Sequence, residues 1–229
     1  MSTVLYKSDL SPPARAVIMI LDVLGVTVET EDLNPVLREQ DAPKFLQKNP
    51  MRTIPLLQEG DYNLADSHAI IIYLMEKYGK AEHAQLYPKD IRKRATIHQR
   101  MFLDCGILFP RLRAIMAPAY MGRLTELNKY MIDNMEDYAY RMLEDYLSQS
   151  VFIAADCLTV ADFSVVTTTS TLNHLHPVDG KRFPKLKKWL QTMSEIEVIK
   201  RINEPAAEMH ALSIKMFMDN NKERQKAKL

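Results

Sequence analysis

Three short segments in the first 70 residues have the residue types of a site for a small peptide. Ser11 stands between a predicted strand and a predicted helix, Ile54-Pro55 enters a strand, and Asp66-Ser67 precedes an apolar helix. An X-Pro bond tolerates the cis form, which here would leave the Ile54 N–H and C=O free to pair with an extended peptide. The helix start at Asp66-Ser67 offers N–H groups and a positive dipole end to a carboxylate. We therefore expect a small acidic peptide as ligand.

Ser11 has two interpretations. A serine followed by proline is a common helix start, so Ser11 can be a plain N-cap. However, Pro12 and Pro13 lack N–H groups, so Ala14 is the first backbone donor that the Ser11 oxygen could accept from, and the hydroxyl hydrogen stays free for a ligand. A thiol held there would be favoured as thiolate by this donor and by the helix dipole.

The energy required for such a thiolate is modest. Lowering a thiol pKa of about 8.5 by two units corresponds to about 2.7 kcal/mol, which one charge-assisted hydrogen bond and a helix terminus can supply together. Ser8 and Tyr6 carry hydroxyls nearby, but Tyr6 falls within a predicted strand and Ser8 lacks the helix position. Ser11 is therefore the strongest candidate for thiol activation.

The elements that must position these residues lie in the first 80 residues, where strand and helix signals alternate. Strands are expected at 4–6, 26–33, 54–58 and 62–64, and helices at 11–24, 43–48 and 67–78. Gly25 is placed to end the first helix, and the turn chemistry of Glu59-Gly60-Asp61 predicts a hairpin. The resulting order, β-α-β-α-β-β-α, is a small α/β unit with mixed strand directions.

From about residue 90 onward strand signals vanish and helical periodicity continues to about residue 215. Met131, Met135, Tyr138, Met142 and Tyr146 recur at three and four residues, which predicts one buried helix face and not a cofactor site.

Two features mark helix starts and ends in this part. Thr159 and Asp162 fit a capping box ahead of an apolar run. Residues 220–229 are charged and lack apolar anchors, so a disordered tail is expected there. We thus expect an α/β domain over 1–80, an all-helical domain over 90–219 and a charged tail over 220–229.

Composition excludes several classes of function. The hydrophobic content of 47% and charged content of 26% are ordinary for a globular protein, and the formal net charge of +1 argues against nucleic acid as a partner. No apolar run approaches the roughly 20 residues that span a bilayer, so no membrane partner is expected. Cys105 and Cys157 match no metal or redox spacing, which indicates no metal and a reduced, cytoplasmic location. The six glycines form no phosphate-binding loop.

One row of side chains on a predicted helix could line a ligand pocket. Its members recur at spacings of three and four: Phe109, Leu112, Arg113, Met116 and Tyr120. An ordinary buried face is one interpretation, and the wall of an apolar substrate pocket, in which methionine adds adaptability, is the other. Pro110 within this segment should bend or interrupt the helix locally.

Five segments, in this order along the chain, together resemble one protein family. They are Asp9-Leu10-Ser11-Pro12-Pro13-Ala14-Arg15, Asn49-Pro50 to Pro55, Asp66-Ser67-His68-Ala69-Ile70, Leu86-Tyr87-Pro88-Lys89-Asp90 and Leu158-Thr159-Val160-Ala161-Asp162-Phe163. The chain resembles the cytosolic glutathione transferases over nearly its whole length, most closely the insect delta/epsilon classes and among these the epsilon class. This resemblance implies a thioredoxin-like N-terminal domain, an all-helical bundle as C-terminal domain and a homodimer.

The resemblance also implies roles for individual residues. Ser11 would hydrogen-bond the glutathione sulfur as the catalytic residue, and Ile54 would pair with the cysteinyl backbone beside cis-Pro55. Asp66 and Ser67 would hold the γ-glutamyl end, with His68 beside them near the dimer interface. The family's hydrophobic substrate pocket corresponds here to Leu10, Pro13, Phe109, Leu112, Arg113, Met116 and Tyr120.

Two positions depart from the family pattern. Met51-Arg52 stands where the family usually has Gln-His, and Gln40 stands where a histidine is frequent. Both family histidines commonly contact the glycyl end of glutathione. Arg52 would replace one contact by a charge pair and Gln40 the other by neutral hydrogen bonds.

Two classes of function compete. The first is a glutathione transferase that stabilises the glutathione thiolate and conjugates it to hydrophobic electrophiles, or uses it for elimination or isomerisation. The second is a dimeric binding protein that sequesters apolar ligands with weak or no turnover, which the residues at 40, 51 and 52 keep open. A thiol-disulfide oxidoreductase is disfavoured because no cysteine occupies the Ser11 position.

Overall fold

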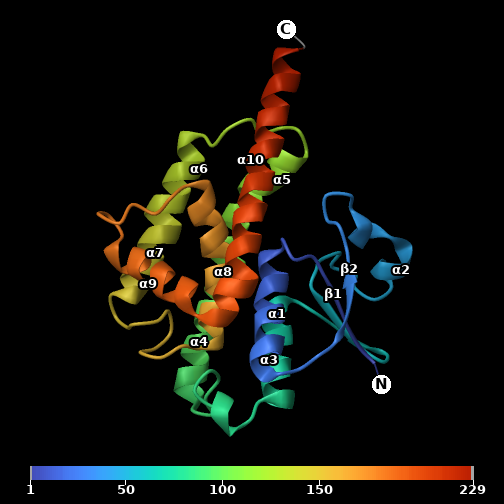
Figure 1. The fold of residues 1–229 in the computed structure, drawn as a ribbon, viewed down its shortest axis with the longest axis vertical. Helices are drawn as coiled ribbons and strands as arrows, with labels where there is room; N and C mark the ends of the chain where they lie inside the picture. Colours follow the sequence, from blue (N-terminus) through green and yellow to red (C-terminus); the bar gives the residue numbers. More distant parts are fainter. Residues whose placement is uncertain (1, 228–229) are drawn as a thin grey trace.

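The computed structural model describes residues 2–227 as an α/β domain packed side by side with a larger helical domain (Figure 1). The first domain contains β1 Thr3–Lys7, α1 Pro12–Leu24, β2 Glu29–Asp32, α2 Pro43–Leu46, β3 Leu56–Glu59, β4 Tyr62–Ala65 and α3 Ser67–Tyr78. The second contains α4 Ile91–Leu103, α5 Phe109–Tyr120, α6 Lys129–Asp133, α7 Arg141–Leu147, α8 Val160–Leu175, α9 Pro184–Glu195 and α10 Glu204–Lys226. The predicted order of strands and helices in the first domain is confirmed.

The sheet of the first domain has the strand order β2-β1-β3-β4. Strand β2 runs parallel to β1, whereas β3 is antiparallel to both β1 and β4. Strand β2 is shorter than expected, and its four residues are all exposed and mostly acidic, as suits an edge strand that must not pair with another sheet. Gly25 ends helix α1, as predicted. Its φ of 65° lies in the left-handed region, which costs little free energy for glycine but more for other residues.

The two domains share one apolar core. Helices α1 and α3 lie between the sheet and the helical domain, and α1 packs directly against α8 (Figure 1). Side chains from both domains, including Ile20, Leu74, Met101 and Phe163, belong to the same buried cluster. This continuous packing fixes the position of α1 relative to α8.

Three π-helical segments interrupt the helical domain at Asp104–Leu108, Asn134–Tyr140 and Ile199–Asn203. The second one corrects a prediction: Met135 is buried, but Tyr138 of the expected buried face is 57% exposed. A π-helical turn holds more residues than an α-helical one, so the periodicity of the sequence does not continue through it. Pro110 lies in the first turn of α5, directly after the first π-helical segment, where the expected local irregularity is found.

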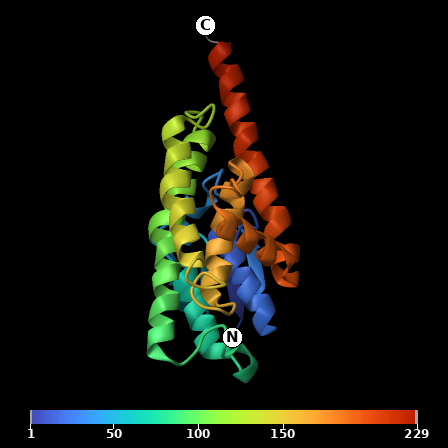
Figure 2. The ribbon, with the colours of Figure 1, turned by 90° about the vertical axis from the view of Figure 1, so that its left-hand side faces the viewer.

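Helix α10 runs along the helical domain and projects beyond it at its C-terminal end (Figure 2). The prediction of a disordered tail is wrong for residues 220–226, which continue this helix. Hydrogen bonds hold this part of the helix in place, because the buried amide of Asn221 donates to the carbonyls of Ala119 and Leu124, both at 2.8 Å. Adding turns to an existing helix is favourable once a tertiary contact supports them. Residues 228–229 lie outside the described residues.

Candidate functional site

Ser11 is the N-cap of α1 and its side chain is half-buried. Its hydroxyl makes no capping hydrogen bond, and the prolines at the first two helical positions offer it no N–H group. The backbone around it is fixed instead: the Ser11 N–H donates to the Ser8 carbonyl at 3.0 Å, and the Ser11 carbonyl accepts from Arg15 at 2.9 Å. A hydroxyl that is not used by the helix is thus held at the positive end of the α1 dipole.

Arg15 fixes the position of the loop that precedes Ser11. It is completely buried, and its guanidinium donates to the Leu10 carbonyl at 3.1 Å, the Thr167 carbonyl at 2.7 Å and the Thr171 hydroxyl at 2.9 Å. Burial lowers the pKa of Arg15 to about 9, although the charge of Glu204 opposes this effect. Arg15 therefore ties the residue before Ser11 to α8 of the other domain.

The loop before β3 presents the Ile54 backbone. The Ile54-Pro55 bond is cis, as expected from the sequence, and the Ile54 N–H and C=O form no backbone hydrogen bond with the rest of residues 2–227. Buried Asn49 organises this loop: its Oδ1 accepts from the Met51 N–H at 3.0 Å and its Nδ2 donates to the Thr53 carbonyl at 2.8 Å.

Arg52, in the middle of that loop, is exposed and has a left-handed backbone with φ of 56°. Gln40 lies half-buried at the 3₁₀ turn Glu39–Asp41, and its Oε1 is buried without a partner among the described residues. Each of these two residues thus keeps a polar group that the described part of the chain does not use.

Asp66 and Ser67 form the start of α3. Asp66 has a φ of 74° and caps the helix, since its Oδ1 accepts from the His68 N–H at 2.8 Å and the Ala69 N–H at 3.2 Å. His68 holds the pKa of the Asp66 carboxyl at about 2, despite partial burial. Asp66 is therefore an anion at neutral pH beside the positive end of a helix, and Ser67 lies buried in the first turn.

His68 lies between two carboxylates. Its ring nitrogens are 3.4 Å from Asp66 Oδ1 and 3.4 Å from Asp104 Oδ2, too long for well-formed hydrogen bonds, so the attraction is mainly between charges. Burial disfavours the charged imidazolium, but Asp104 and Asp66 outweigh it and raise the pKa of His68 to about 9. Because Asp104 belongs to the helical domain, this row of charges joins the two domains beside the start of α3.

The expected substrate-pocket residues divide into different environments. Leu10, Pro13, Phe109, Met116 and Tyr120 are half-buried, as the lining of a pocket would be. Leu112 is completely buried and packs in the core, whereas Arg113 is exposed. Of the five α5 residues, Leu112 is therefore buried in the core, Arg113 is exposed to solvent, and the other three are intermediate in exposure.

Comparison with known protein families shows which family the chain matches. Residues 5–82 match the family model of the glutathione S-transferase N-terminal domain, and residues 133–197 match that of the glutathione S-transferase C-terminal domain. The chain belongs to the glutathione S-transferase family. A curated relative, glutathione S-transferase 1 of Manduca sexta, is 38% identical over 207 residues, which cover 90% of this chain and 94% of that protein.

Solved structures of other glutathione S-transferases have the same fold. The epsilon-class enzyme of the housefly Musca domestica superposes with a TM-score of 0.89 at 37% identity, covering 94% of this chain and 98% of that one. A glutathione transferase homologue of Drosophila mojavensis, solved with bound glutathione, superposes with a TM-score of 0.86 at 35% identity, covering 94% and 97%. The protein is thus a transferase of the insect delta/epsilon type with a thioredoxin-like N-terminal domain, and the alternative of a binding protein without turnover is not favoured.

Sequence reasoning did not predict that Asp104 lies beside His68. It stands 36 positions after His68, at no recognisable spacing, and a single acidic residue on a predicted helix carries no signal. Only the packing of α3 against the helical domain brings the two side chains together.

The His68 charge predicts how stability changes with pH. An imidazole with a pKa of about 9 when folded and 6.5 when unfolded stabilises the fold fully below pH 6.5, and this contribution is lost as the pH rises through 9. We expect the free energy of unfolding to fall by about 3 kcal/mol over that range in the wild type, and by clearly less in His68→Gln. Urea denaturation at a series of pH values measures this difference. His174→Gln is a control, because His174 does not belong to the Asp66–His68–Asp104 charges, and it should keep the wild-type dependence of stability on pH. An equal dependence on pH in wild type and His68→Gln would contradict the charge assigned to His68.

Proposed function

We propose that this glutathione S-transferase stabilises the glutathione thiolate at Ser11 and transfers it to small hydrophobic electrophiles. The observation that carries the proposal is the Ser11 hydroxyl, which is held at the positive end of α1 and takes no part in capping that helix. A hydroxyl that donates to sulfur, together with the helix dipole, favours the ionised thiol.

The rest of the tripeptide would be held at both ends and in the middle. The free N–H and C=O of Ile54, beside Pro55, suit an antiparallel pairing with the cysteinyl residue. Asp66 and Ser67 suit the γ-glutamyl end, because an anionic carboxylate can accept from its amino group and the α3 terminus can bind its carboxylate.

Arg52 and Gln40 are the proposed partners of the glycyl carboxylate. A guanidinium can bind a carboxylate with two parallel hydrogen bonds, and the unpartnered Gln40 side chain adds neutral ones. The relative solved with bound glutathione supports the choice of ligand.

The reaction itself needs only the thiolate and a held electrophile. For a chlorodinitrobenzene, the sulfur forms a bond to the ring carbon that carries chlorine, the carbon–chlorine bond breaks, and chloride leaves, while the thiol proton has passed to solvent beforehand. Catalysis consists of a raised thiolate fraction and of proximity to a ring in the apolar pocket. The same thiolate would serve elimination or isomerisation.

We further propose a cytoplasmic homodimer. Two aromatic side chains, Tyr62 on β4 and Phe102 on α4, are 47% and 61% exposed and would be covered by a second copy. Reduced cysteines suit the cytoplasm. Among residues 2–227, no helix is long and apolar enough to cross a membrane.

Turnover of a chlorodinitrobenzene with glutathione tests the proposed function. We expect saturable conjugation by the wild-type protein, followed by absorbance of the product. A protein that binds apolar dyes and glutathione but shows no rate above the uncatalysed reaction would overturn the proposal.

A further inference from the structure

Arg15 connects the Ser11 loop to the helical domain, although the proposed reaction has no step at its side chain. Its guanidinium donates to the carbonyl of Leu10, the residue before Ser11. It also donates to two groups on α8, the Thr167 carbonyl and the Thr171 hydroxyl, which stand 152 and 156 positions further along the chain. One side chain thus joins the start of α1 to the other domain.

The position of the Ser11 hydroxyl depends on the backbone that Arg15 holds. The hydroxyl makes no capping hydrogen bond with α1, so the backbone on either side decides where it points. The peptide group between Leu10 and Ser11 carries the carbonyl that accepts from the Arg15 guanidinium at 3.1 Å. A shift of this peptide group would move the hydroxyl away from the sulfur, and a hydrogen bond weakens steeply when its geometry is lost.

The buried charge of Arg15 is not neutralised by a carboxylate. The side chain is completely buried and forms no salt bridge within the part of the chain that the structure describes. Asp9 and Arg201 lie beside it, but Asp9 pairs with Lys7 and Arg201 pairs with Asp22, each at 2.8 Å. Burying a guanidinium among neutral oxygens costs free energy that a well-packed apolar side chain would not cost. Stability alone therefore does not account for an arginine at this position.

Two titratable side chains of α10 lie near the Arg15 guanidinium. Glu204 attracts its charge, but this carboxylate accepts hydrogen bonds from Asn203 at 3.1 Å and Ser170 at 3.3 Å. Burial, and then the charge of Arg15, lower the pKa of His210 to about 3. Because burial lowers the pKa of Arg15 only to about 9, Arg15 stays largely charged and His210 stays neutral between pH 7 and pH 8.5.

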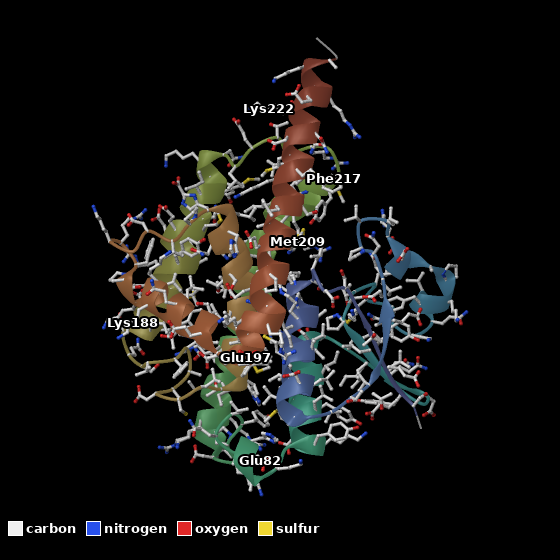
Figure 3. All side chains as sticks on the ribbon, viewed as in Figure 1. Glu82, Lys188, Glu197, Met209, Phe217 and Lys222 are labelled. Carbon is white, nitrogen blue, oxygen red and sulfur yellow. The ribbon has the colours of Figure 1, made fainter. Side chains whose placement is uncertain are left out.

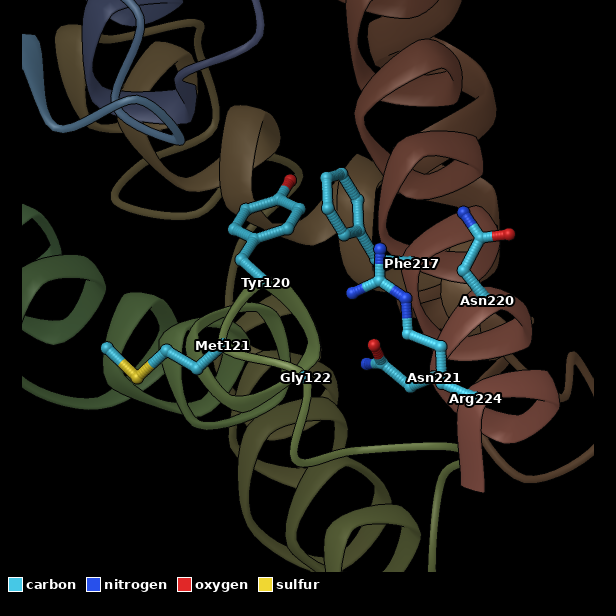
Figure 4. A pocket seen from close by; sticks show the side chains of 7 residues that line it. All are labelled: Tyr120, Met121, Gly122, Phe217, Asn220, Asn221 and Arg224. Carbon is cyan, nitrogen blue, oxygen red and sulfur yellow. The ribbon is translucent and has the colours of Figure 1, made fainter. Parts of the chain in front are cut away.

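Arg15 also lies apart from the apolar cavity between the end of α5 and the last turns of α10. This cavity contains Tyr120 of the proposed electrophile pocket, and the residues that line it do not include Arg15 (Figure 4). Figure 3 shows Phe217, which lines the cavity, toward the C-terminal end of α10, whereas α1 lies lower in the view, at the level of Glu197. An effect of Arg15 on catalysis is therefore expected at the thiol.

We propose that Arg15 is a positioning residue for thiolate formation: by tying the Leu10 carbonyl to α8, it keeps the Ser11 hydroxyl aligned with the glutathione sulfur. The inference rests on the proposed function of Ser11 and adds a residue that is too deeply buried to touch glutathione. Since Arg15 acts through the Ser11 hydroxyl, its effect vanishes when that hydroxyl is absent. A direct attraction between the Arg15 charge and the thiolate would persist in Ser11→Ala, so a double-mutant cycle separates the two.

The thiolate fraction of bound glutathione tests the inference, measured by ultraviolet absorbance with the protein in excess. Wild type, Arg15→Lys, Arg15→Met and Ser11→Ala are compared at pH 7. Ser11→Ala is also compared with Ser11→Ala/Arg15→Met and Ser11→Ala/Arg15→Lys at pH 8.5, where its less acidic thiol is partly ionised.

Arg100→Met is the matched control for loss of a buried arginine. Arg100 donates to a backbone carbonyl too, that of Ile153 at 3.0 Å, but it lies on α4 and contacts no residue of the proposed site. Urea denaturation of every variant measures the loss of stability separately.

We expect Arg15→Met and Arg15→Lys each to lower the thiolate fraction at pH 7 about threefold, as the bound pKa rises from about 6.5 to about 7.5. Lysine keeps the charge but lacks the planar fork that bonds to both domains, so it should not restore the alignment. In the Ser11→Ala background, about one half of the thiol should be ionised at pH 8.5 with or without Arg15. Arg100→Met should lose stability and keep the wild-type thiolate fraction.

A wild-type thiolate fraction in Arg15→Lys would overturn the inference, because the charge without the fork would then be enough. Equal pKa shifts from Arg15→Met with and without the Ser11 hydroxyl would also overturn it, and so would equal effects of Arg15→Met and Arg100→Met on the thiolate. If Arg15→Met does not fold, Arg15→Lys alone completes the cycle. A wild-type thiolate fraction in Ser11→Ala would instead contradict the proposed function, and the inference with it.

Discussion

Replacing Ser11 by alanine is expected to raise the apparent pKa seen in kcat/KM for the electrophile, at saturating glutathione, by about two units, from about 6.5 to about 8.5. The alanine removes the Ser11 hydroxyl at the α1 terminus, which we propose donates to the sulfur, so the thiol pKa returns toward its free value. At pH 7 the thiolate fraction then falls about 25-fold, and kcat/KM falls by up to that amount. Part of the loss is offset because a more basic thiolate is a better nucleophile.

The pH profile separates this effect from damage to the fold. At pH values above both pKa values, wild type and Ser11→Ala should react at similar rates, because glutathione is ionised in both. Ser8→Ala is the matched control: it removes a hydroxyl three residues earlier, whereas the Ser8 carbonyl that holds Ser11 remains. A Ser11→Ala profile with the wild-type inflection would show that the hydroxyl does not set the thiol pKa.

The largest expected loss of stability comes from Asp162→Ala. This side chain is completely buried at the start of α8 and accepts four hydrogen bonds. The donors are the Ile153 and Thr159 N–H groups at 2.9 Å, the Thr159 hydroxyl at 3.0 Å and Trp189 Nε1 at 3.2 Å. Truncation leaves these buried donors without partners, so we expect the free energy of unfolding to fall by about 4 kcal/mol.

Urea denaturation at pH 7 measures this loss, with Asp156→Ala as a control. Asp156 also accepts a backbone hydrogen bond, from Val151 at 3.1 Å, but it is exposed, so its loss should cost under about 1 kcal/mol. If Asp162→Ala and Asp156→Ala lowered the free energy of unfolding by equally small amounts, the buried capping box would not be a main source of stability in the helical domain.

The features that sequence predicted correctly depend on strong local chemistry. Pro12 and Gly25 bound α1 because proline suits a first helical turn and glycine tolerates a left-handed backbone. The capping box at Thr159 and Asp162 is also local, since its members are three residues apart. Such signals need no knowledge of the rest of the fold.

The features that sequence missed depend on tertiary contacts. The end of α10 is ordered by Asn221, whose partners are about a hundred positions away, and the π-helical segments follow no periodicity that sequence reveals. In the site, the left-handed backbone of Arg52 and the pairing of His68 with Asp104 are likewise set by the folded chain. The family pattern placed Leu112 in the pocket, but the packing of the helical domain buries it completely.

The most direct test of the account is a titration of the glutathione thiol while it is bound to the protein, followed by the ultraviolet absorbance of the thiolate. We predict a bound pKa about two units below the free value of about 8.5 in the wild type, and a value near the free one in Ser11→Ala. A bound thiol that titrates like free glutathione in the wild type, or one that stays equally acidic without the Ser11 hydroxyl, would contradict the central role given to Ser11.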